Sequence, residues 1–167
     1  MKRLLCLMVM LTMTLGIMSV AYAEEDETML ALNIQAVKAN LDAAELKYDQ
    51  LGDNNDVFKL NYTLDGTLNS GTLWIAVYDD GVQFEADYDI SATDANRTVV
   101  AEKLCQINAQ LRIGGFYIEE KGTIGNGSFY YTGSQVPSQE GITEYRDAVL
   151  GNLESYSEEI AEVLFSK

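Results

Sequence analysis

The stretch TLWIAVYDDGVQFEADYDI, residues 72–90, decides the fold because it contains two strands and the turn between them. Residues 82–90 alternate strictly, which is typical of a half-buried strand with an acidic outer face. The apolar side chains of that strand are Val82, Phe84, Ala86, Tyr88 and Ile90, and the polar ones are Gln83, Glu85, Asp87 and Asp89. Residues 72–78 are apolar on both sides, which predicts a central strand covered on both faces. The intervening Asp79-Asp80-Gly81 predicts a hairpin.

Helices and further strands are predicted on either side of this hairpin. Apolar residues recur at helical spacing over 28–45, about 93–111 and 142–164. Shorter alternating runs predict strands at 57–64, 116–119 and 123–132. The order is then α-β-β-β-α-β-β-α, and all strand-to-strand links but one are of hairpin length. This order predicts an α+β fold, with a mostly antiparallel five-stranded sheet and helices packed on one face.

The glycines of residues 111–133, LRIGGFYIEEKGTIGNGSFYYTG, raise the question of a ligand loop. Gly114 and Gly115 are placed to end a helix, and Gly122 to form a turn. Gly125 and Gly127 fall within a predicted strand, where glycine usually marks a bulge. No helix is predicted after them, so the dinucleotide-binding fingerprint fails. The sequence predicts structural glycines and no cofactor site.

The first 23 residues have the three-part pattern of a secretory signal peptide. Lys2 and Arg3 precede an apolar run at 4–20, and Ala21 and Ala23 supply the small residues of a cleavage site. The alternative is an uncleaved membrane anchor, since the run approaches spanning length. Cleavage fits the following acidic run, residues 24–27, better. We therefore predict a leader at 1–23, one domain at 24–167, no stable membrane insertion after cleavage, and a periplasmic or extracellular location.

Charge and composition exclude several kinds of partner and site. The formal net charge is −15, which opposes binding to nucleic acid. Solubility is the simpler explanation of this charge, and a basic protein or peptide partner is compatible with it but not required. The chain has no histidine, which removes the commonest general base and metal ligand. Cys105 would be the one cysteine left after cleavage, and its neighbours suggest a small hydrophobe at the edge of the core. Asp53, Asn55 and Asp56 do not follow the spacing of a calcium loop, so no metal is predicted.

The acidic face and the tyrosines are the candidate binding residues. Glu85, Asp87 and Asp89 would offer charged contacts, with Tyr130 or Tyr131 as an aromatic anchor. They favour a non-enzymatic module that binds a protein or peptide on the open sheet face and its strand edges. The alternative is a small-ligand or carbohydrate-binding module that uses exposed tyrosines. A histidine-free hydrolase built on carboxylates is a third class, but no spacing selects a pair of acids.

One junction carries a family resemblance. Residues 107–118, INAQLRIGGFYI, resemble the helix-to-strand junction of YbjN-domain proteins, where an asparagine near the helix end leads into a small residue, an aromatic residue and a short strand. Other matching features are Leu46-Lys47-Tyr48 before the first strand, residues 74–78 before a turn and an alternating strand, and a closing helix with Tyr145 to Val163. The resemblance covers about residues 30–165.

The resemblance implies a fold and a class of role. The family is similar in fold to type III secretion chaperones, with the same order α-β-β-β-α-β-β-α, and is described as regulating sensory transduction. It supplies no catalytic residues for this chain. The related chaperones are acidic and bind extended segments of partner proteins, often as dimers, which leaves a homodimer open here. This chain departs from them in its predicted leader, which favours a periplasmic or exported binding module.

Overall fold

Three helices and six strands make up residues 28–166, which are the residues that the computed structural model describes. The predicted leader and its cleavage site at Ala21 and Ala23 lie outside them. The helices are α2 (Met29–Ala43), α3 (Arg97–Asn108) and α4 (Gln139–Leu164). The strands are β1 (Asp49–Leu51), β2 (Val57–Thr63), β3 (Ser70–Tyr78), β4 (Gly81–Ser91), β5 (Gly115–Ile118) and β6 (Thr123–Tyr131).

The strands form one antiparallel sheet in the order β1-β2-β3-β4-β6-β5. The predicted hairpin lies at its centre, with Tyr78 of β3 paired to Gly81 of β4. This architecture confirms the predicted α+β fold. The predicted number of five strands was one too low, because β1 has only three residues and is too short to show an alternating pattern.

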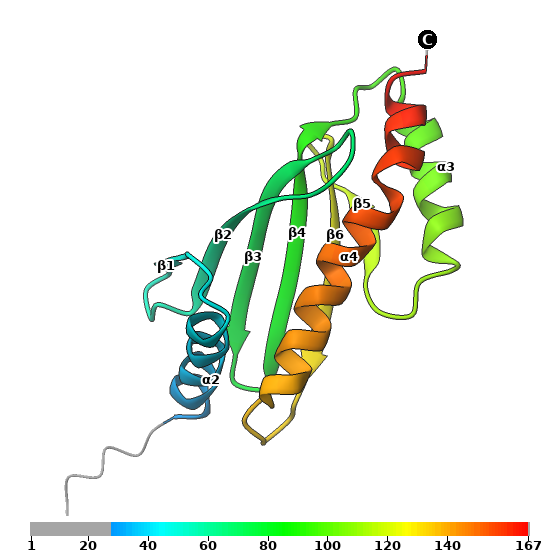
Figure 1. The fold of residues 1–167 in the computed structure, drawn as a ribbon. Helices are drawn as coiled ribbons and strands as arrows, with labels where there is room; N and C mark the ends of the chain where they lie inside the picture. The colour runs from blue at the N-terminus through cyan, green and yellow to red at the C-terminus, as the bar shows by residue number, and fades with distance from the viewer. Residues whose placement is uncertain (1–27, 167) are drawn as a thin grey trace, which may run out of the picture.

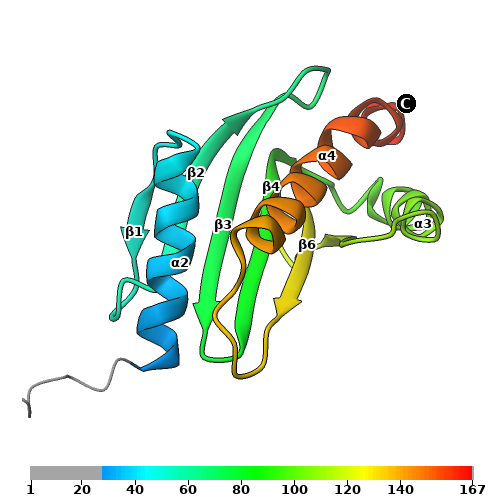
Figure 2. The ribbon, with the colours of Figure 1, turned by 60° about the horizontal axis from the view of Figure 1, so that its bottom comes forward.

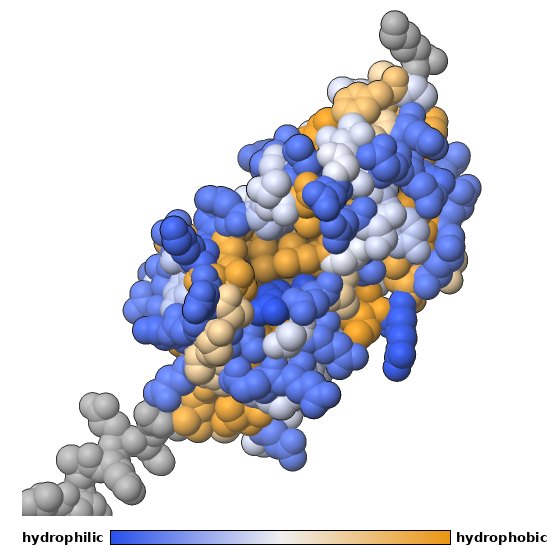
Figure 3. Space-filling model, viewed as in Figure 1, coloured by the Kyte–Doolittle hydropathy of each residue, from blue (hydrophilic) through white to orange (hydrophobic). Residues whose placement is uncertain are grey.

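The helices all pack on one face of the sheet (Figures 1 and 2). Beneath them lies the apolar side of β4, where Val82, Phe84 and Ala86 are fully buried. On this side of the molecule, hydrophobic residues show between α2 and α4, and hydrophilic residues cover most of the outer surface (Figure 3). Because the predicted stripe of β4 faces the helices, its acidic residues face the other way.

The prediction that β3 is covered on both faces is wrong for the described residues. Leu73, Ile75 and Val77 are buried beneath the helices. The side chains between them alternate onto the opposite face, where Trp74 and Ala76 are half-buried and Tyr78 is exposed. No helix in residues 28–166 packs there (Figures 1 and 2). A central strand with two apolar sides therefore has only one of them covered.

Local polar contacts set the ends of the helices. The Thr28 side chain accepts a hydrogen bond from the Ala31 amide at the start of α2. Helix α3 begins later than predicted, because the Asn96 side chain accepts hydrogen bonds from the backbone and hydroxyl of Thr93 and forms a turn there. It also ends before the glycine pair, at Asn108. Gly114, with φ of 80°, instead forms the turn into β5.

Candidate functional site

Several strands contribute side chains to the side of the sheet that no helix of residues 28–166 covers, and we call this side the open face. Paired residues of neighbouring strands point to the same side, so the register defines its members. Trp74 pairs with both Lys59 and Glu85, and Gln83 pairs with Phe129. The open-face side chains used below are Lys59, Trp74, Ala76, Tyr78, Gln83, Glu85, Asp87, Asp89, Tyr117, Phe129 and Tyr131.

Aromatic rings gather at one end of the open face, near the β3–β4 turn. The ring centroids of Tyr78 and Phe129 are 6.0 Å apart. Tyr78 is 44% exposed, Phe129 is 42% exposed and Tyr131 is 69% exposed. We call these three residues the aromatic end. Soluble proteins seldom leave large apolar side chains adjacent and uncovered without a binding role.

Carboxylates gather further along β4, and we call Glu85 and Asp87 the acidic end. The Tyr117 hydroxyl donates a hydrogen bond to Asp87 Oδ1 at 2.8 Å, and Gln83 Nε2 donates one to Glu85 Oε1 at 2.6 Å. Both carboxylates are half-buried. Within residues 28–166, neither forms an ion pair with a basic side chain. The acidic end therefore holds negative charge that no cation of the described chain neutralises.

The environment of Asp87 makes ionisation of its carboxyl less favourable than it is in water. Burial raises the pKa of this carboxyl, the Tyr117 hydrogen bond lowers it, and the charges of Glu119 and Glu85 raise it further. The net shift is upward from the usual aspartate value of 3.8. A positive charge brought to the acidic end would reverse this effect, because it would stabilise the ionised carboxylate.

We expect Asp87→Asn to raise the melting temperature at pH 7. A carboxyl whose pKa is raised on folding destabilises the folded state when it is ionised, and this cost is lost as the pH falls from the raised pKa towards the usual one. Asparagine can still accept the Tyr117 hydrogen bond. The gain over wild type should therefore shrink between pH 7 and about pH 4, as measured by thermal melts across this range. A gain that is constant with pH would contradict this account.

Gly125 and Gly127 leave space through which Tyr117 reaches Asp87. The prediction that they mark a bulge in their own strand is wrong. A Cβ added at Gly125 would lie 2.1 Å from Asp87 Oδ1 and 2.6 Å from the Tyr117 ring. A Cβ at Gly127 would lie 3.3 Å from the same ring. The register shift lies on β4 between Asp87 and Ser91, beyond the pair of Asp87 with Gly125. Gly125 and Gly127 therefore leave room for the ring that lies across β6.

Trp74 lies beside the acidic end, where it pairs with Glu85 of the neighbouring strand. The Lys59 ammonium is 5.1 Å from the centroid of the Trp74 ring, within cation–π range. The chain has one tryptophan, so its fluorescence reports on the open face alone. Sequence analysis missed Trp74, Tyr78 and Phe129 as site residues, because their exposure depends on which face the helices leave uncovered.

The predicted site residues are divided between the two faces. Glu85, Asp87 and Asp89 lie together on the open face, with Asp89 exposed beyond the acidic end. Of the two tyrosines offered as the anchor, Tyr131 lies on this face. Tyr130 lies on the helix side, where its ring stacks on Tyr145 with centroids 4.9 Å apart. The open face thus brings together four of the five predicted contact residues.

Contacts from α3 occupy much of the outer edge of β5, one of the two edges where strand addition was expected. The Phe116 amide donates to Asn108 Oδ1 at 2.7 Å, and Asn108 Nδ2 donates to the Phe116 carbonyl at 2.9 Å. The Arg97 guanidinium donates to the carbonyls of Glu119 and Glu120. The other edge strand, β1, is three residues long. Both edges are short or occupied, which protects a sheet from strand addition.

We expect Asn108→Ala to destabilise the domain by about 1–2 kcal/mol, because it removes two hydrogen bonds and leaves the Phe116 amide and carbonyl without partners. Chemical denaturation measures the difference. Gln106→Ala, at an exposed position of the same helix, is the control and should stay within about 0.5 kcal/mol of wild type. Equal stability of the two variants would show that Asn108 does not hold this edge.

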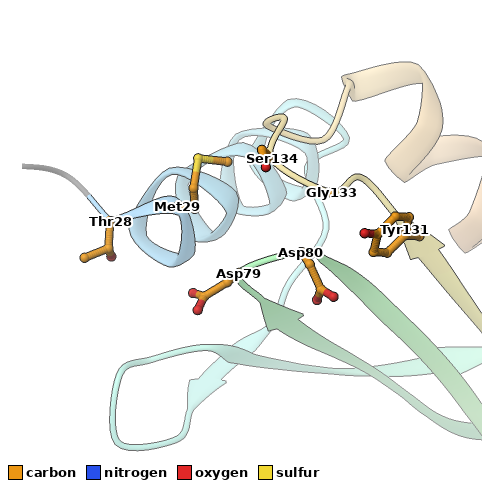
Figure 4. Close-up of a pocket in the computed structure, with 7 residues that line it drawn as sticks. All are labelled: Thr28, Met29, Asp79, Asp80, Tyr131, Gly133 and Ser134. Atoms are coloured by element: carbon orange, nitrogen blue, oxygen red, sulfur yellow. The ribbon is translucent and has the colours of Figure 1, made fainter.

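Two of the hollows in residues 28–166 lie at the start of α2 and against α3. One of about 400 Å³ is lined by Thr28, Met29, Asp79, Asp80, Tyr131, Gly133 and Ser134 (Figure 4). The carboxylates of Asp79 and Asp80 point away from Ser134, so they do not converge with the other lining residues (Figure 4). The second, of about 280 Å³, lies between α3 and β5 and includes Cys105, which is exposed and does not lie at the edge of the core as predicted. Within residues 28–166, no three acidic or cysteine side chains are placed to hold a metal ion.

Comparisons with known proteins agree with the resemblance. A family model described as "Putative bacterial sensory transduction regulator", YbjN, matches residues 33–162. The crystal structure of YbjN from E. coli, described as "a putative transcription regulator", superposes with a TM-score of 0.56 at 10% identity. The match covers 75% of this chain and 92% of that one, which supports the shared fold. No curated protein matches the chain. None of the helices in residues 28–166 has the length and apolar character needed to cross a membrane. With most of its length matched by the family model, the chain belongs to the YbjN family.

Proposed function

We propose that this chain is an exported, non-enzymatic binding module that engages a protein or peptide partner on its open face, in a regulatory role. The observation that carries the proposal is the uncovered second side of β3, where Trp74, Ala76 and Tyr78 lie beside Phe129 and no helix of residues 28–166 packs over them. A central strand with two apolar sides is ordinarily covered on both. A partner would supply the missing cover.

The family description and the charge support this role. The family is described as a sensory transduction regulator, which fits a binding role. The net charge of −15 opposes contact with a phosphate backbone, so regulation through protein contact fits the chain better than direct binding to DNA. The same charge would steer a basic partner towards the domain.

Site-specific photo-crosslinking in the native host tests the proposal. A photoreactive phenylalanine analogue at Ala76 would lie on the open face, and the same analogue at Glu154 would lie on the exposed side of α4 as the control. We expect a discrete protein adduct from position 76 and none from position 154. Equal adducts from both positions, or none from either, would contradict the proposal. An adduct of twice the chain mass would show that a second copy covers the face.

Cleavage of the predicted leader can be tested separately from binding. If the leader is cleaved after Ala23, protein from the periplasm or medium should have a mass that corresponds to a chain beginning at Glu24. Intact-mass spectrometry of the fractionated host measures this. An Ala21→Asp, Ala23→Asp variant should keep its leader, because charged residues at those positions are poor cleavage sites. A full-length chain retained in the membrane fraction would favour the anchor alternative.

The aromatic end also favours a second candidate, a carbohydrate-binding module. Tyr78, Phe129 and Tyr131 expose ring surface beside the polar Gln83, and sugars commonly stack on such rings. Soluble glycans that quench Trp74 fluorescence, under conditions where peptides do not, would support this candidate over the first. Quenching by peptides alone would exclude it.

A further inference from the structure

The two ends of the open face define the chemistry of a partner, and this inference rests on the proposed function. We propose that the open face takes an extended segment of another protein that lies along β4, with an aromatic side chain on the aromatic end and an arginine or lysine on the acidic end. The occupant is a foreign basic segment and not a second copy of this chain. A second copy would carry the same net charge of −15 and would repel the first, whereas a basic segment would be attracted.

The aromatic end selects the first contact. Eight large apolar side chains are exposed in residues 28–166, and four of them lie on the open face. One is Leu51 of β1, and the other three are the residues of the aromatic end. The tilted pair of Tyr78 and Phe129 leaves the surfaces of both rings accessible at 44% and 42% exposure. A third ring can pack against such a pair edge-to-face or offset, which is worth more than its buried area alone.

The acidic end selects the second contact. Glu85 and Asp87 are half-buried, and Tyr117 and Gln83 donate one hydrogen bond to each site without supplying positive charge. Glu119 adds a third negative charge from the end of β5, and Asp89 lies further along β4. A guanidinium placed here could donate to both carboxylates and stack on the Tyr117 ring.

The position of Lys59 indicates where the basic residue of the partner would lie on the open face. Its ammonium lies over Trp74, in the same cross-strand row as Glu85 of the acidic end. A basic side chain of the partner placed in that row would meet the Lys59 charge, so it belongs at the next open-face position along β4, which is Asp87. Gln83, which pairs with Phe129, and Asp87 are four residues apart on β4, which corresponds to about 13 Å. An extended segment spans the same distance when its aromatic and basic residues are about four positions apart.

The sheet edges favour docking on the face over strand addition. Asn108 already pairs with the outer backbone groups of Phe116, and Arg97 donates to the carbonyls of Glu119 and Glu120 just after β5. An added strand at β5 would have to displace them. A segment over the face displaces no protein contact, and it covers the apolar side of β3.

Synthetic peptides and Trp74 fluorescence test the inference. The probe is a short amidated peptide of serine and glycine that carries a phenylalanine about four residues before an arginine. One control peptide places the two residues next to each other, and another replaces arginine with glutamate. Each is titrated into the mature protein, and the Trp74 emission gives the dissociation constant. The protein variants are Asp87→Asn, Phe129→Ser and, as a matched loss of one charge on α4, Glu154→Gln.

The inference requires the spaced phenylalanine–arginine peptide to bind more tightly than both controls. Asp87→Asn should then weaken binding about two- to five-fold and reduce its salt dependence. Phe129→Ser should weaken it about ten-fold, and Glu154→Gln should leave it unchanged. Circular dichroism establishes that each variant is folded.

Three results would overturn the inference: equal binding of the glutamate peptide, an unchanged affinity of Asp87→Asn, or no binding of any peptide. If a discrete protein adduct still formed at position 76 in the host, the proposed function would stand and only the chemistry assigned to the partner would fall. If neither peptides nor cross-linking gave a signal, both would fall.

Discussion

Gly71→Ala is expected to destabilise the domain by about 3 kcal/mol, because the methyl group has no space between the central strands. A Cβ at Gly71 would lie 1.8 Å from the backbone carbonyl oxygen of Asp87 and 2.4 Å from the Tyr62 hydroxyl. That hydroxyl donates a hydrogen bond to the same carbonyl at 2.8 Å. The backbone atom cannot move away without breaking the pairing of β3 with β4.

Chemical denaturation followed by circular dichroism measures the loss, and Gly151→Ala is the matched control. Nothing lies within 4 Å of a Cβ at Gly151, which is inside α4. Alanine has the higher helix propensity, so this second variant should be more stable than wild type by about 0.5–1 kcal/mol. If the free energy of unfolding falls in one glycine-to-alanine variant and rises in the other, the space around each glycine decides the effect. A loss below about 1 kcal/mol at Gly71 would mean that the strands separate easily there.

The central hairpin was predictable because alternation in β4 reports directly on burial. Val82 and Phe84 face the helices, and Glu85 and Asp87 face away, as the pattern of residues 82–90 indicates. The acidic half of the candidate site therefore followed from the sequence. The aromatic half did not, because β3 is apolar on both sides and its pattern cannot show which side the helices cover. Tyr78 is exposed because the described helices pack on the other side of β3.

The buried apolar positions of the helices were predicted correctly, but the buried polar side chains among them were not. Val37 and Leu41 of α2 are fully buried as expected, but Asn33 and Asn40 are buried beside them. A pattern of apolar residues cannot identify a buried amide, whose partners are distant in sequence. Asn33 Nδ2 donates to the carbonyls of Tyr78 and Asp79 at the β3–β4 turn. These contacts, made across the fold, determine where α2 sits.

Asn40→Ala should destabilise the domain by about 3 kcal/mol, because Asn40 joins α2 to α4 through three hydrogen bonds. Its Nδ2 donates to the Gln139 carbonyl at 3.1 Å and to Thr143 Oγ1 at 2.9 Å, and its Oδ1 accepts from Arg146 Nη1 at 3.0 Å. Arg146 is only 9% exposed, so losing this acceptor leaves a buried cation with the exposed Asp147 as its remaining partner. Denaturation of the variant and of Lys38→Ala, an exposed control on α2, measures the effect.

A double-mutant cycle with Arg146→Met separates the buried charge from the other two bonds of Asn40. Methionine fills a similar volume without a charge, so Arg146→Met alone should change stability by about 1 kcal/mol or less. If most of the Asn40→Ala loss comes from the stranded guanidinium, the double variant should be more stable than Asn40→Ala by about 1–2 kcal/mol. If the two losses simply add, the contacts of Asn40 with Gln139 and Thr143 are what hold α2 against α4, and Arg146 finds other partners when Asn40 is removed.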